Sequence, residues 1–150
     1  MKINADSFVN EKPEHVLKTV FGYDTLRTLK KDIITNVLKG KDTLAVMPTG
    51  GGKSLCYQLP ALIMEGITLV VSPLISLMQD QVGSLKTNGI NSVFLNSSLS
   101  WEEYLQAIDE IKNGQIKILY VSPEGLATQK IRELLSAPEI KISCITIDEA

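Results

Sequence analysis

Short apolar segments alternate with longer amphipathic segments along most of this chain, and that alternation constrains the fold more than any other feature. The segments of β-type composition are residues 43–47, 67–71, 92–95, 116–121 and 142–147, and most are continuous apolar runs. Continuous runs of this length are typical of parallel strands that are buried on both faces. The sequence therefore predicts an α/β fold with a five-stranded parallel sheet and helices on both faces.

Helical periodicity fills the remaining segments, including the polar N-terminal part. Gly40 is a stop signal for a helix there, and Ser100 with Glu103 forms a capping-box pattern. Pro60 is expected to kink its helix or to end the first part of it. No linker or repeat is evident, so one unit is expected. The predicted helices are residues 14–20, 25–38, 53–64, 74–86, 101–112 and 123–135.

The composition excludes several classes of protein. With 150 residues, 44% hydrophobic and 21% charged, the chain has the size and balance of one globular domain and is not disordered. Its longest apolar region, residues 61–78, is interrupted by polar residues, glycine and proline, so no membrane span is predicted. Residues 1–10 lack the apolar core of a secretory signal. A formal net charge of −2 neither indicates nor excludes nucleic-acid binding, because a local basic groove suffices.

A glycine-rich loop follows the first predicted strand, where residues 47–54 read Met-Pro-Thr-Gly-Gly-Gly-Lys-Ser. The glycines allow several backbone N–H groups to point into one concavity, and the following helix adds the positive end of its dipole. Lys53 would reach the β- and γ-phosphates of a nucleotide, and the Ser54 hydroxyl would bind Mg²⁺. Met47 stands where the usual pattern has its first glycine. The strand–loop–helix context nevertheless favours a phosphate-binding loop over a chance glycine turn.

An acidic pair, Asp148 and Glu149, follows the last predicted strand. In a parallel sheet this position lies at the same edge as the phosphate loop, where ligands bind. Asp148 would hold Mg²⁺ through water, and Glu149 would orient or deprotonate an attacking water. Taken alone, such a pair is more often a turn or a helix cap. Combined with the loop on one sheet, it favours a nucleotide-hydrolysing site.

These segments together resemble the RecQ-type DNA helicases of superfamily 2. The resemblance covers the chain from about residue 21 to its end and is carried by five segments. They are Phe21-Gly22-Tyr23 with Arg27, residues 47–57, residues 72–82, residues 119–124, and Asp148-Glu149-Ala150.

The resemblance implies a RecA-like P-loop NTPase domain, the first motor domain of an ATP-dependent, 3′-to-5′ DNA helicase, here incomplete. Residues 1–40 would form a helical segment whose base-binding element spans residues 21–30, and residues 41–150 the first RecA-like domain, truncated at its C-terminal end. ATP and Mg²⁺ are the implied cofactors. Single-stranded or forked DNA and DNA-repair or recombination proteins are the implied partners, without a membrane. The implied compartment is the cytoplasm, at the nucleoid, in a bacterium and the nucleus in a eukaryote.

The family's roles transfer to matching positions only. Catalytic roles fall on Lys53, Asp148 and Glu149, and metal binding on Ser54 and Asp148. The nucleotide would contact Tyr23, Arg27, Thr49, Gly50, Gly51, Gly52, Lys53 and Ser54. The DNA strand would lie along Ser72, Pro73, Ser76, Gln79, Asn96 and Ser97.

Two departures from the family pattern matter. The family has a glutamine that pairs with the adenine edge three residues after Arg27, whereas this chain has Lys30, which has donors only. The chain also stops at Ala150, inside the Asp-Glu-Ala-His-type motif. The strand that follows this motif in the family would lie between residues 43–47 and residues 142–147, so a gap in the sheet is expected. The second motor domain with its arginine is absent as well, and the chain alone is expected to be inactive.

Alternatives remain open at this point. A DEAD-box RNA helicase, or a non-catalytic nucleotide- or DNA-binding module, would share part of these motifs. Trp101 is interpreted as packing into the core at the start of its helix, with base stacking as the alternative. Cys56 and Cys144 are interpreted as buried thiols. The loose basic cluster of Lys30, Lys31, Lys39 and Lys41 is interpreted as a solvated helix face, with a DNA patch as the alternative.

Overall fold

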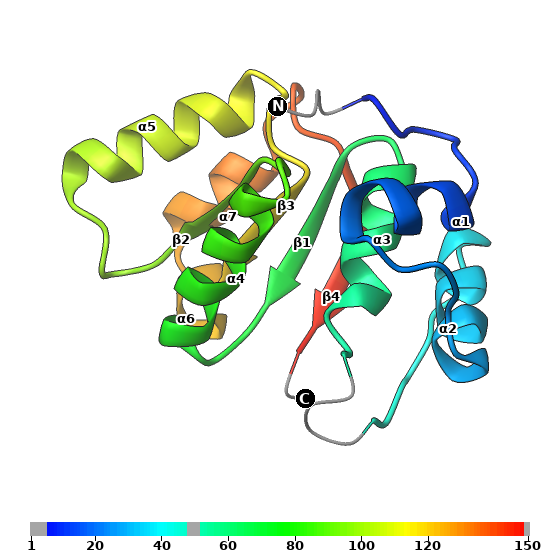
Figure 1. The fold of residues 1–150 in the computed structure, drawn as a ribbon. Coiled ribbons are helices and arrows are strands. Elements are labelled where there is room, and N and C mark those ends of the chain that lie inside the picture. The colour runs from blue at the N-terminus through cyan, green and yellow to red at the C-terminus, as the bar shows by residue number, and fades with distance from the viewer. Residues whose placement is uncertain (1–5, 48–51, 149–150) are drawn as a thin grey trace. The chain divides into compact units, whose positions relative to one another are not determined.

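The computed structural model describes residues 6–47 and 52–148, and the chain divides into two compact units. The first unit comprises residues 6–65, and the second begins at Gly66. Figure 1 shows the elements of both. Each unit has its own arrangement and is described by itself.

The first unit is helical. It contains α1 (Pro13–Val16), the π-helix η1 (Leu17–Phe21), α2 (Thr28–Leu38) and α3 (Leu55–Ile63). Gly22 and Gly40 end η1 and α2 respectively, each with a φ of +76° that favours glycine. Every residue of α3 from Cys56 onward is buried, as its continuous apolar composition predicts. The helix continues past Pro60 to Ile63, so the proline does not end it.

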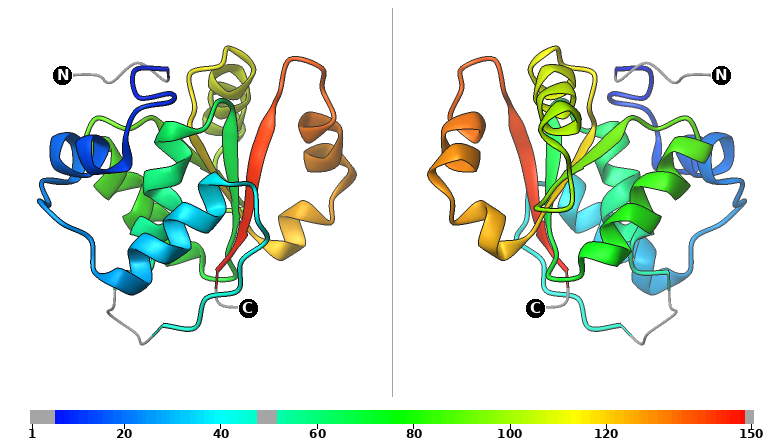
Figure 2. Two further views of the ribbon diagram at one scale, coloured as in Figure 1. Left: turned by 90° about the vertical axis from the view of Figure 1, so that its right-hand side faces the viewer. Right: turned by 90° about the vertical axis from the view of Figure 1, so that its left-hand side faces the viewer.

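The second unit is a four-stranded parallel sheet with helices on both faces. Its strands are β1 (Ile67–Val71), β2 (Ser92–Leu95), β3 (Ile118–Val121) and β4 (Ile142–Ile147), in the order β2-β3-β1-β4. Figure 2 shows α4 on one side of the sheet and α6 and α7 on the other. The helices are α4 (Ile75–Thr87), α5 (Trp101–Lys112), α6 (Pro123–Leu126) and α7 (Gln129–Leu135).

The register of this sheet aligns the carboxyl ends of all four strands. Val71 of β1 pairs with Val121 of β3 and with Ile147 of β4, and Leu95 of β2 pairs with Val121. The residues that come directly after this row therefore emerge along one edge of the sheet. They are Ser72, Asn96, Ser122 and Asp148.

The core of the second unit explains why the apolar runs became strands. Side chains from alternate positions of β1, β2 and β3 pack with Ala107 and Ile111 of α5 and with Ile131 and Leu134 of α7. All five residues of β1 are buried, since this strand lies between β3 and β4 and is covered on both faces. The α/β fold class and the parallel sheet are thus confirmed.

Two predicted elements differ in the structure. Residues 43–47 do not form a strand, and Leu44 and Val46 are 89% and 88% exposed. A strand needs a neighbour for its backbone N–H and C=O groups, and no described residue pairs with this segment. The predicted helix over residues 123–135 is divided into α6 and α7, because the Thr128 hydroxyl accepts a hydrogen bond from the Ile131 amide and begins a new helix.

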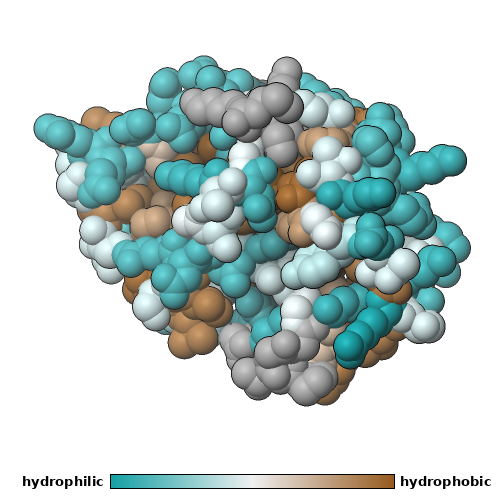
Figure 3. Space-filling model, viewed as in Figure 1, coloured by the Kyte–Doolittle hydropathy of each residue, from teal (hydrophilic) through white to brown (hydrophobic). Residues whose placement is uncertain are grey.

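Exposed apolar side chains occur in separate places on this protein. On the face shown in Figure 3, hydrophilic side chains predominate between smaller hydrophobic patches. In β4, which ends the sheet, Ile145 and Ile147 are exposed on alternate positions. None of the helices in the described ranges, 6–47 and 52–148, is long and apolar enough to cross a membrane.

The capping box that begins α5 gives the first testable prediction. The Glu103 amide donates to the Ser100 hydroxyl (3.2 Å), and the Ser100 amide donates to the Glu103 carboxylate (3.0 Å). Replacing Ser100 with Ala removes the hydroxyl acceptor and should lower the free energy of unfolding by about 1 kcal/mol. Urea denaturation followed by circular dichroism measures this, with Ser100→Thr as the control that keeps the hydroxyl.

The same capping box predicts that the stability of the fold depends on pH. The hydrogen bonds from the Ser100 backbone and side chain lower the pKa of Glu103. A lowered folded-state pKa stabilises the fold above the unfolded-state value of about 4.3, and this contribution is lost as the pH falls through the folded-state value. The Glu103→Gln variant should lack that part of the acid dependence. The measurement is the free energy of unfolding as a function of pH. An unchanged pH dependence in Glu103→Gln would contradict the prediction.

Candidate functional site

The described end of the glycine-rich loop runs directly into α3. Gly52 has a φ of +72°, and its carbonyl accepts a hydrogen bond from the Leu55 amide at 3.3 Å. The carbonyls of Lys53 and Ser54 accept from the amides of Cys56 (3.1 Å) and Gln58 (2.9 Å). Lys53 and Ser54 are half-buried and directly precede α3. Thr49, Gly50 and Gly51 lie outside the described residues.

The predicted base-binding element belongs to the same unit. Gly22 ends η1 in a left-handed conformation, and the Tyr23 amide donates to the Leu17 carbonyl at 3.4 Å. This turn leaves the Tyr23 ring exposed. Arg27 is also exposed and occupies the N-cap position of α2. Both side chains are therefore free of the core and open to a ligand.

Lys30 lies beside the loop, which the sequence alone did not indicate. Its Nζ atom is 2.6 Å from the position that a Cβ atom on Gly52 would take. Its charge also acts on the Cys56 thiol: burial raises the pKa of Cys56, and the nearby Lys30 ammonium opposes that rise. Lys30 is half-buried, whereas Lys31, Lys39 and Lys41 are exposed.

Asp148 lies at the carboxyl end of β4, in the second unit. Its amide donates to the Val71 carbonyl at 2.9 Å, which continues the β1–β4 ladder by one residue, and its side chain is half-buried. A carboxylate is an oxygen donor of the kind that Mg²⁺ prefers, so the type of this residue fits that ion. Glu149 lies outside the described residues.

The residues predicted to line a DNA strand gather after β1 and β2. Pro73, Ser76 and Gln79 are exposed at the start of α4. Ser72 is buried instead, and its hydroxyl accepts a hydrogen bond from the Leu74 amide at 3.3 Å. Its side chain therefore shapes the turn into α4 rather than facing solvent.

A short hydrogen-bonded chain joins two of these predicted residues through Ser98. Gln79 Nε2 donates to Ser98 Oγ at 3.4 Å, and Ser98 Oγ donates to Asn96 Oδ1. The Ser98 amide donates to the same Asn96 oxygen at 2.8 Å, which closes an Asx turn. Ser98 was missed by sequence reasoning, although its place in an Asn-Ser-Ser turn after a strand was a signal for it.

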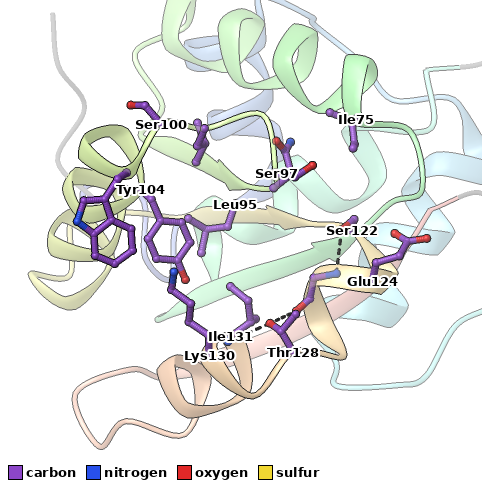
Figure 4. Close-up of a pocket in the computed structure, with 14 residues that line it drawn as sticks. Ile75, Leu95, Ser97, Ser100, Tyr104, Ser122, Glu124, Thr128, Lys130 and Ile131 are labelled. Carbon is purple, nitrogen blue, oxygen red and sulfur yellow. Dashed lines mark hydrogen bonds between the residues drawn. The ribbon is translucent and has the colours of Figure 1, made fainter.

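Asn96 and Ser97 also line a cavity of about 610 Å³. Figure 4 shows it between the end of β2 and the helices that follow the strands. The N-cap residues of α5, α6 and α7, which are Ser100, Ser122 and Thr128, all line it. The cavity therefore opens at the edge of the sheet where ligands of parallel α/β folds bind.

Aromatic side chains form one wall of this cavity. The rings of Trp101 and Tyr104 are parallel within 6°, with centroids 6.0 Å apart. Lys130 Nζ lies 4.6 Å from the centroid of the first ring and 3.8 Å from that of the second. Trp101 is 63% exposed, so the interpretation of this residue as a core anchor is wrong. The capping box places residue 101 in the first turn of α5, away from the apolar face that carries Ala107 and Ile111.

The two cysteines differ in environment. Cys56 is buried in α3, as expected, whereas Cys144 in β4 is only partly buried. Both thiols are free. Within the described ranges, no group of three or more His, Cys, Asp or Glu side chains could hold a metal ion.

A family profile described as DEAD/DEAH box helicase matches residues 27–150. The chain belongs to the DEAD/DEAH box helicase family. It is 51% identical over 146 residues to the Haemophilus influenzae protein named ATP-dependent DNA helicase RecQ. That match covers 96% of this chain and 23% of the relative, so the chain spans about a quarter of the relative's length. The resemblance to RecQ helicases is thereby confirmed.

Solved structures of helicases share the fold. A structure described as the DUF1998 helicase MrfA bound to DNA and AMPPNP has a TM-score of 0.71 at 23% identity, and the match covers 98% of this chain and 21% of that one. A hypothetical ATP-dependent RNA helicase from Sulfolobus tokodaii has a TM-score of 0.67 at 19% identity, with 93% and 41% covered. Together with the parallel sheet, these matches identify the fold of this family member as that of a helicase motor domain.

Tyr104 gives a prediction about the aromatic wall. Its hydroxyl is buried without a hydrogen-bond partner among the described residues, and burial raises the pKa of Tyr104. Removing a buried, unsatisfied hydroxyl is nearly neutral or stabilising. Tyr104→Phe should therefore leave the free energy of unfolding unchanged within about 0.5 kcal/mol or raise it. Tyr104→Leu, which loses the ring, is the control and should be less stable. A clear loss of stability in Tyr104→Phe would show that the hydroxyl has a partner.

Proposed function

We propose that this chain is the nucleotide-binding motor part of a RecQ-type DNA helicase, which couples ATP hydrolysis to 3′-to-5′ translocation along DNA and to its unwinding. The observation that carries the proposal is the 51% identity to a protein named ATP-dependent DNA helicase RecQ, across 96% of the chain. The described loop supports it, because Lys53 and Ser54 lie at the N-terminal end of a buried helix. A positive helix end and a lysine suit a triphosphate.

In this proposal the nucleotide lies across the phosphate loop. Backbone amides of Thr49, Gly50, Gly51 and Gly52 bind the phosphates, and Lys53 neutralises the charge that develops on the γ-phosphate. Tyr23 and Arg27 flank the base, since both are exposed beside the start of α2. Glu149 orients the water that attacks the γ-phosphorus in line.

Ser54 and Asp148 are proposed to hold Mg²⁺, which when bound supplies positive charge to the phosphate oxygens. The hydroxyl and the carboxylate offer hard oxygen donors. Asp148 also has a fixed backbone, because its amide is bonded to the Val71 carbonyl. The ladder thus presets the carboxylate at the carboxyl edge of the sheet.

The DNA strand is proposed to lie along the start of α4 and the turn after β2. Pro73, Ser76, Gln79, Asn96 and Ser97 lie on these elements, and Ser72 supports the turn from inside. Hydroxyl and amide groups of this kind contact phosphates and sugars without reading sequence. DNA-repair proteins are further proposed partners, and the cytoplasm or nucleus is the proposed compartment.

An RNA helicase is the second candidate, because a hypothetical RNA helicase shares the fold at 19% identity. Hydrolysis of ATP by the full-length protein, measured with single-stranded DNA and with RNA of the same sequence, separates the two. Stimulation by DNA supports the proposal. Stimulation by RNA alone would replace it, and hydrolysis under neither condition would favour a non-catalytic binding module.

Lys53→Ala tests the hydrolytic site. Loss of the ammonium should reduce DNA-stimulated ATP hydrolysis by about 100-fold or more, because electrostatic stabilisation of the transition state is lost. The far-ultraviolet circular dichroism spectrum should not change. Lys18→Ala removes an exposed lysine of η1 and serves as the matched control, with normal turnover expected. Normal turnover by Lys53→Ala would remove the basis of the assignment.

Asn96→Asp tests the DNA path without breaking the turn. The new carboxylate can still accept the bonds from Ser98, so the Asx turn is kept, while the donor amide is replaced by a negative charge. DNA affinity at low salt should fall about fivefold, since like charges about 4 Å apart in water repel by about 1 kcal/mol. Fluorescence anisotropy of a labelled oligonucleotide measures this DNA affinity.

The matched control is Asn88→Asp, which adds the same charge at the C-terminal end of α4, where the residue is exposed. Its affinity for DNA should stay within twofold of the original protein. Equal losses in both variants would indicate a general charge effect and would contradict the proposed path.

A further inference from the structure

Lys30 extends from the first turn of α2 to the last glycine of the phosphate loop. A Cβ atom on Gly52 would lie 2.6 Å from Lys30 Nζ and 3.5 Å from Lys30 Cε. The end of this side chain therefore covers the face of Gly52 from which a side chain would project. Because Gly52 has a φ of +72° and no side chain, the ammonium can approach the loop backbone closely.

We propose that Lys30 is a second phosphate-binding cation of the nucleotide site, acting with Lys53 on the polyphosphate rather than on the base. The inference rests on the proposed nucleotide-binding function and adds one residue to it. A triphosphate bound at the loop carries more negative charge than one lysine neutralises. A second ammonium beside residues 52–54 adds charge-assisted hydrogen bonds.

The alternative role, reading the base, has different chemistry. An ammonium has donors only, so it cannot accept a bond from the adenine amino group. Guanine offers two acceptors, N7 and O6, to the same lysine. A base-reading Lys30 would therefore favour GTP, whereas a phosphate-binding Lys30 contributes equally to ATP and GTP.

The test compares three ligands in one displacement assay with the full-length protein. ATP, GTP and inorganic tripolyphosphate compete with a fluorescent ATP analogue, and dissociation constants are measured for the original protein and for Lys30→Met, which removes the charge without adding an amide that could pair with adenine. The proposal expects Lys30→Met to weaken the binding of all three ligands by a similar factor of about 10, the size of one charge-assisted hydrogen bond. Lys31→Met, at an exposed lysine on the next position of α2, is the matched control and should change none of the three dissociation constants by more than twofold.

Three outcomes overturn the proposal. If only the ratio of ATP to GTP changes and tripolyphosphate binds as before, Lys30 reads the base. If Lys30→Met binds all three ligands normally, Lys30 is a solvated lysine. If the original protein binds none of the three, the nucleotide site itself is refuted along with the inference. Only this last result also removes the proposed function.

Discussion

The parallel pairing of β1 with β3 and β4 is the constraint on which the second unit depends. It buries all five residues of β1 and brings Val71, Val121 and Ile147 into one row. Since β2 joins the same row through Leu95, every strand ends at the same level. Polar side chains that follow the strands are then placed side by side by the backbone ladder alone, before any of them makes a specific contact.

The polar residues that follow the strands have a structural role as well as a proposed functional one. Ser72 and Ser122 accept bonds from the backbone just ahead, and Asn96 closes a turn with Ser98. Each hydroxyl or amide satisfies an N–H group where the chain leaves its strand for a helix. A cavity lined by Asn96 and Ser122 is therefore built from groups whose orientation is already fixed. Such preorganisation would lower the entropic cost of binding any ligand there.

The sequence predicted the sheet well because the relevant signal is local. The predicted bounds are correct for strands 92–95 and 142–147 and for helix 101–112. Continuous apolar runs and a capping box can be recognised within a few residues of sequence. Residues 43–47 have the same apolar composition and yet form no strand, because a strand also needs a partner. Leu44 and Val46 are accordingly exposed.

The candidate site shows the same division between local and distant information. Motif spacing predicted which residues follow each strand and which stand at the start of α3. It could not show that the end of the Lys30 side chain lies near Gly52, because the two residues are 22 positions apart and come together only when α2 and α3 pack against each other. Motif spacing also could not show that the Trp101 side chain is exposed beside Tyr104 and Lys130. Its exposure depends on which side of α5 packs against the sheet. A lysine that the sequence alone shows only as a departure from the family pattern thus lies, in the fold, with its ammonium near Gly52.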